Sequence, residues 1–92
     1  MGTENNGMHI DEITERCRWA RDHNQEHPSG EWSIDEQLAV ALVLRDRNHL
    51  ETVGYTFEQA TDRVCQAAGL NALEFTGWLN DIRKALENDQ RG

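Results

Sequence analysis

Apolar residues occur along this chain in runs and repeats that predict helices. The longest unbroken apolar run is LAVALVL, residues 38–44. Because successive residues of a helix are about 100° apart, seven consecutive apolar residues cover every side of a helix and not one stripe. We therefore expect a helix over residues 34–53 that is buried at the centre of the molecule and covered by other helices.

Three other segments have apolar residues at intervals of three and four, the spacing of an amphipathic helix. They are residues 9–24, residues 57–68, and a final helix that opens at Asn71 and ends near Leu86. The predicted inward residues are Ile10, Ile13, Cys17 and Ala20 in the first, Phe57, Ala60, Thr61, Val64, Cys65 and Ala68 in the second, and Phe75, Trp78, Leu79, Ile82 and Leu86 in the third.

Capping residues mark where these helices begin and end. A Ser, Thr or Asn followed three residues later by Glu or Gln can exchange hydrogen bonds with the backbone at a helix start. Such pairs are Ser33 with Glu36, Thr56 with Gln59, and Asn71 with Glu74. Gly54 and Gly69 are suited to the left-handed residue that ends a helix, and Pro28 excludes a helix from the segment 23–31.

A chain of 92 residues is long enough to build one hydrophobic core without disulfides or metals. The pattern predicts an all-α, single-domain four-helix bundle over residues 9–87, with a buried central helix over residues 34–53. Residues 1–8 and 88–92 contain few apolar side chains that could offset the entropy lost on ordering, so we expect flexible tails there.

The net charge restricts the partners. Lys and Arg number 9 against 17 Asp and Glu, which gives −8. Such a chain repels phosphate backbones and favours basic partners. No apolar run approaches the roughly 18 residues of a membrane span, and the N-terminus does not have the pattern of a signal peptide. We therefore expect a cytoplasmic protein with no membrane partner.

The residues that could hold a metal or form a disulfide are few. Cys17 and Cys65 fall on apolar faces, which favours buried thiols over the alternative of a disulfide between neighbouring helices. His23 and His27 have the spacing of a metal-binding pair on a helix, but Pro28 pushes His27 out of helical geometry. We expect solvated histidines, no metal and no cofactor.

Candidates for catalysis are equally few. The chain has no Gly-rich phosphate loop and no nucleophile elbow, and Ser29 and Ser33 belong to a turn and a cap. Asp46 and His49 could form an acid–base pair. A polar helix end near solvent is the favoured interpretation of these two residues, so we expect no enzyme.

The segments EQLAVALVLRD, GYTFEQA and GLNALEFTGWLNDIRKAL resemble the four-helix DNA-binding region of bacterial sigma factors and related regulators. The resemblance covers residues 35–86. It implies that the last two helices, which meet at Ala68-Gly69-Leu70 with almost no loop, form a helix-turn-helix. In that family the exposed face of the last helix reads bases and phosphates.

The exposed face of the last helix is not basic in this chain. Only Arg83 and Lys84 lie near it, and Glu74 and Asp81 offset their charge, whereas DNA affinity comes largely from Lys and Arg. Nucleic acid is therefore disfavoured. The residues that this face offers are Asn71, Ala72, Leu73, Thr76, Gly77 and Asn80.

We expect a small acidic, non-catalytic binding or regulatory protein that contacts another protein, which is itself basic or DNA-binding. A helix-turn-helix DNA-binding regulator is the alternative. The predicted contact residues are Leu73, Thr76, Gly77 and Asn80, because Leu73 falls outside the inward stripe and Gly77 is costly inside a helix. The oligomeric state is left open.

Overall fold

The computed structural model describes residues 9–25 and 27–89, and the predicted tail at 1–8 and residues 90–92 lie outside them. The described residues contain no strand. Their helices form one compact unit with a Cα radius of gyration of 12.4 Å. In chain order they are α1 (Ile10–His23), α2 (Ile34–Leu44), α3 (Arg47–Val53), α4 (Phe57–Ala68) and α5 (Ala72–Asp89).

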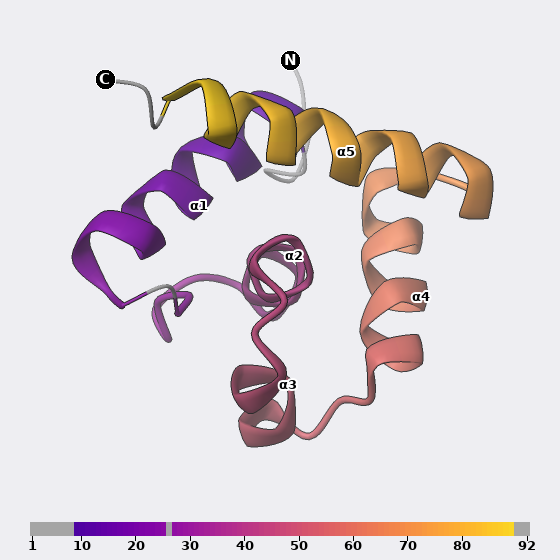
Figure 1. Cartoon of the computed structure of the whole chain (residues 1–92). Coiled ribbons are helices and arrows are strands. Elements are labelled where there is room, and N and C mark those ends of the chain that lie inside the picture. The colour runs from indigo at the N-terminus through magenta and orange to yellow at the C-terminus, as the bar shows by residue number, and fades with distance from the viewer. Residues whose placement is uncertain (1–8, 26, 90–92) are drawn as a thin grey trace, which may run out of the picture.

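The α2 helix lies at the centre. Figure 1 shows it end-on, with α1 on one side, α4 on the other and α5 running across both. Every residue from Leu38 to Leu42 is completely buried. The prediction of a buried central helix is therefore confirmed. The helix has 11 residues.

No helix in the described part of the chain is both long and apolar enough to cross a membrane.

The prediction of one helix over residues 34–53 is wrong, because the chain turns between α2 and α3. Arg45 adopts a left-handed conformation with φ of 59°, and the Asp46 N–H donates to the Ala41 carbonyl at 2.8 Å. The Asp46 side chain then accepts from the His49 N–H and starts α3. The molecule consequently has five helices in the described residues, where the sequence predicted four.

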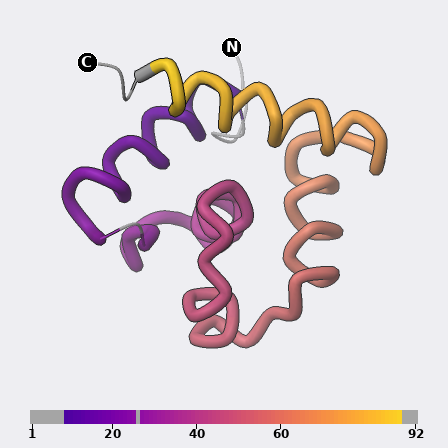
Figure 2. Tube along the Cα trace, viewed as in Figure 1, coloured from indigo at the N-terminus to yellow at the C-terminus, as the bar shows by residue number. Residues whose placement is uncertain are grey.

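The α5 helix joins the two ends of the described chain. Figure 2 shows α5 leaving α4 and running to α1, so the first and last helices lie together. The helix continues to Asp89, past the predicted end near Leu86. Its predicted inward residues are all buried, which confirms the predicted rotation of this helix. They are Phe75, Trp78, Leu79, Ile82 and Leu86.

The predicted caps form. Reciprocal hydrogen bonds join Ser33 to Glu36, Thr56 to Gln59, and Asn71 to Glu74. Gly54 and Gly69 end α3 and α4 with φ of 81° and 72°. After Gly69, the Leu70 N–H donates to the Cys65 carbonyl at 2.8 Å. Three residues therefore suffice to join α4 to α5.

Candidate protein-contact surface

The side of α5 that faces away from the core carries an exposed apolar side chain next to a glycine. Leu73 is 86% exposed, and Thr76, Gly77 and Asn80 are exposed as well. Residues at intervals of three, four and seven share one side of a helix. The four predicted contact residues therefore form one continuous patch, which we call the α5 outer face.

Among the residues that the structure describes, no contact explains Gly77. A Cβ atom added at Gly77 would meet nothing within 4 Å, so alanine would fit in this fold. Glycine inside a helix is destabilising by about 0.5–1 kcal/mol relative to alanine. The fold thus carries this cost without an internal reason, while a second protein approaching α5 would gain from the missing side chain.

A groove between α4 and α5 adjoins the α5 outer face. Its volume is about 560 Å³, and Thr76 belongs both to the groove and to the outer face. The walls are mainly apolar at Cys65, Leu70 and Phe75. An apolar side chain of a partner could therefore be received beside Leu73.

Phe57 corrects one prediction for α4. The sequence placed Phe57 on the inward face with Ala60 and Val64, which are completely buried. Phe57 itself is 57% exposed. It is the first residue of α4, so it stands at the end of the helix where the core no longer covers it, and it lines the groove.

The charges near the α5 outer face are arranged differently from a DNA-reading surface. The Arg83 guanidinium donates to the carbonyls of Leu42 and Val43 at 3.0 and 3.1 Å, so it caps the end of α2. Asp81 and Lys84 are exposed and carry opposite charges. The α5 outer face itself keeps no charged side chain.

The structure gives Asp46 a role that the sequence interpretation missed. Asp46 is buried, not a polar residue near solvent. Its Oδ1 accepts from the His49 backbone N–H at 3.2 Å, and its Oδ2 lies 2.5 Å from Nδ1 of His27. The loop before α2 is therefore joined to the start of α3. An Asp that follows an apolar helix by two residues was the available signal, because Asp favours helix N-caps.

The His49 ring is bound to Gln37 and not to Asp46. Its Nε2 lies 2.8 Å from Oε1 of Gln37, whose amide in turn donates to the Trp32 carbonyl at 2.8 Å. Burial lowers the pKa of His49 below its ordinary value of 6.5, and the nearby Asp46 charge opposes this shift. Asp46 and His49 therefore act as structural links, and their side chains are not arranged as an acid–base pair.

The other metal and thiol candidates are separated. His23 lies beside the Trp19 ring, while His27 contacts Asp46, so the two imidazoles serve different neighbours. Within residues 9–25 and 27–89, no group of three or more His, Cys, Asp or Glu side chains could hold a metal. Cys17 and Cys65 are free thiols, and burial raises the pKa of Cys17 to about 12.

No family model matches the chain, and neither do the curated proteins or the solved structures with which it was compared.

Proposed function

We propose that this chain is a small acidic, non-catalytic binding or regulatory protein that acts by contact with another protein through the α5 outer face. One observation carries the proposal: Leu73 is 86% exposed one turn before a helical glycine with nothing within 4 Å of its Cβ position. Contiguous exposed apolar surface marks protein-interaction sites, and Leu73 lies beside the mainly apolar groove between α4 and α5.

The expected partner is basic, and it can itself be a DNA-binding protein. The net charge of −8 attracts positively charged surfaces. Around the α5 outer face, Glu74 and Asp81 are exposed. An apolar centre with a charged rim is the usual composition of a protein interface, and acidic side chains at the rim select basic partners.

A DNA-binding regulator is the second candidate. The feature that favours it is the short link between α4 and α5, which suits a helix-turn-helix and the resemblance to sigma factors. The neutral outer face and the inward position of Arg83 disfavour it, because phosphate contacts need exposed Lys and Arg.

The proposal is tested by affinity capture from the source cell with four immobilised baits. The baits are the wild-type protein, Leu73→Glu, Gly77→Arg and the control Asn88→Glu, which adds an acidic charge at an exposed position near the other end of α5. We expect wild type and Asn88→Glu to retain the same protein partner and both face variants to lose it, as quantified by mass spectrometry.

Circular dichroism and thermal melts accompany the capture. Leu73→Glu should keep helix content and melting temperature, because Leu73 does not pack in the core. Gly77→Arg should keep helix content without lowering the melting temperature, because position 77 has free space around it and arginine favours a helix more than glycine does. If both variants stay folded and still retain the wild-type partner, the α5 outer face is not the contact surface. Loss of the partner by Asn88→Glu to the same degree would show a general charge effect instead.

A further inference from the structure

The arginines of this chain fall into two groups. Four of the seven described arginines form ion pairs with carboxylates of their own chain: Arg16 with Glu36, Arg18 with Glu15, Arg21 with Asp22, and Arg63 with Asp35. The other three are Arg45, Arg47 and Arg83, and no ion pair joins them to another described residue. All three line one cavity.

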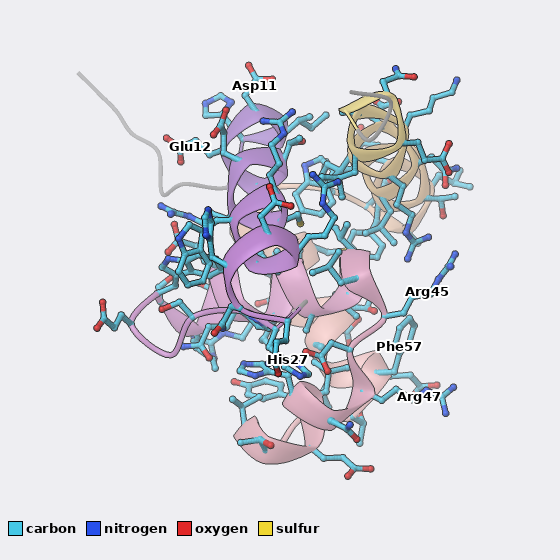
Figure 3. All side chains as sticks on the ribbon, turned by 60° about the vertical axis from the view of Figure 1, so that its left-hand side comes forward. Asp11, Glu12, His27, Arg45, Arg47 and Phe57 are labelled. Carbon is cyan, nitrogen blue, oxygen red and sulfur yellow. The ribbon has the colours of Figure 1, made fainter. Side chains whose placement is uncertain are left out.

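This cavity, which we call the α2–α3 cavity, lies where the turn between α2 and α3 faces α4 and α5. Its volume is about 390 Å³, within the range of small-molecule sites. Leu50, Phe57 and Leu79 supply apolar walls. Figure 3 shows the Phe57 ring between the side chains of Arg45 and Arg47 at one edge of the molecule.

Arg83 is held in place before any ligand arrives. Its Nε and Nη2 donate to the carbonyls of Val43 and Leu42. A guanidinium has five N–H donors, so donors remain for an anion. Burial and the charge of Arg45 both lower the pKa of Arg83. The two guanidinium groups therefore repel each other, and a bound anion would relieve this repulsion.

Asp46 is the one carboxylate among the described residues that line the cavity, and it cannot neutralise the three arginines. Asp46 Oδ2 is bound to His27 and Oδ1 to the His49 N–H, and its side chain is only 6% exposed. Three cations against one committed carboxylate leave a local positive charge in a chain whose net charge is −8.

We propose that the α2–α3 cavity binds a small organic anion, a carboxylate or phosphate attached to a compact apolar body. Arg45 and Arg47 hold the anionic group, Arg83 supports them, and Leu50, Phe57 and Leu79 contact the apolar body. Guanidinium groups suit both anions because their parallel N–H groups bind two oxygens at once. The site shares no residue with the α5 outer face and does not depend on the proposed protein contact.

The test is an NMR titration of the ¹⁵N-labelled full chain with phenyl phosphate, phenylacetate and the uncharged 2-phenylethanol. We expect saturable shifts of amides around Arg45, Arg47 and Phe57 with at least one of the two anions. The uncharged alcohol should bind at least about tenfold more weakly, because it lacks charge-assisted hydrogen bonds. The two anions show whether the site prefers carboxylate or phosphate.

Three variants make the test specific. Arg47→Ala and Arg45→Gly should each weaken binding of the preferred anion by about tenfold, and glycine keeps the left-handed conformation of position 45. Lys84→Ala removes the same charge from an exposed position beside Arg83 and should leave binding unchanged.

Three results would overturn the proposal. The first is no saturable binding of either anion at 10 mM probe, a concentration chosen because weak fragments bind with about millimolar affinity. The others are equal binding of the uncharged alcohol, and equal losses of binding in Lys84→Ala and the arginine variants. None of them bears on the capture experiment, since the α5 outer face is left unaltered.

Discussion

Three polar side chains are buried among the described residues, and two of them connect α3 to other parts of the chain: Gln37, in the first turn of α2, and Asp46, the N-cap of α3. Each has its hydrogen bonds satisfied: Gln37 binds the Trp32 carbonyl and the His49 ring, and Asp46 binds His27 and the His49 N–H. Because an unsatisfied buried polar group costs about 1–3 kcal/mol, this network favours one arrangement of the corner.

His49 should make the stability depend on pH. Burial lowers its pKa in the folded protein below the ordinary 6.5, so the unfolded chain takes up a proton more readily as the pH falls. The contribution of the neutral ring is complete above pH 6.5 and is lost as the pH falls through 6.5 toward the folded-state pKa. The free energy of unfolding can be measured by urea denaturation at pH 7.5 and pH 5.5, on either side of the roughly 6.5 pKa of free histidine. Its decrease between these pH values should be smaller in His49→Gln than in wild type.

Comparison of these two proteins removes the effect of the other titrating groups. An equal loss of unfolding free energy in His49→Gln and wild type would contradict the role given to this imidazole. Glutamine is the suitable replacement because its amide can still reach a hydrogen-bonding partner without changing charge.

At the scale of elements, the junction of α2 and α3 is one of two places where a described non-glycine residue has a positive φ, and the other is Gln25. Arg45 has φ of 59°, and a residue with a Cβ atom pays about 1–2 kcal/mol in this region. Hydrogen bonds hold Arg45 in this conformation. The N–H groups of Arg45 and Asp46 donate to carbonyls at the end of α2, and the Asp46 side chain caps α3. The turn brings Arg45 and Arg47 to the cavity that Arg83 of α5 also lines.

Arg45→Gly should therefore stabilise the protein by about 1 kcal/mol relative to Arg45→Ala, since only glycine adopts this conformation without a steric cost. Both variants lose the guanidinium, so their difference isolates the backbone. The measurement is the free energy of unfolding from urea denaturation. Equal stability of the two variants would show that Arg45 is not strained.

Element boundaries were predictable wherever a capping pair marked them, and the α2–α3 break was not. The capping residues at three helix starts predicted those starts correctly, and all three caps form. They are Ser33, Thr56 and Asn71. The identity of Arg45 does not indicate that α2 ends there, because arginine rarely takes a left-handed conformation. The residue three positions after Asp46 is His49, and a capping box needs Glu or Gln there. The predicted helix over residues 34–53 therefore ran through the turn.

At the scale of the whole molecule, stability depends on the burial of α2. Leu42→Ala should cost about 2–5 kcal/mol, because the side chain is completely buried and a cavity would remain. Leu73→Ala is the matched control with the same chemical change at an exposed position, and it should stay within about 0.5 kcal/mol of wild type. Thermal and urea denaturation of the two variants provide the comparison, and a Leu42→Ala melt that overlays the parent would contradict the central position of α2.

The α5 outer face was predictable because a stripe of five inward residues fixed the rotation of one long helix. Leu73 and Gly77 were then left outside by geometry alone. The α2–α3 cavity was not predictable. Arg45, Arg47 and Arg83 come together only through the unpredicted turn and the packing of α5, and Phe57 joins them because the start of α4 extends beyond the core.

We propose that the α5 outer face contacts protein and not nucleic acid. The most direct measurement is a fluorescence anisotropy titration of the labelled protein, at physiological salt, with the captured partner and with a random DNA duplex. We predict saturation with the partner, loss of that saturation in Leu73→Glu, and no saturable binding of the duplex, because the face offers no basic residues to phosphates. Salt-sensitive binding of the duplex at about 1–100 µM, the usual range of nonspecific DNA binding, together with a Leu73→Glu variant that binds the partner as well as wild type, would contradict it.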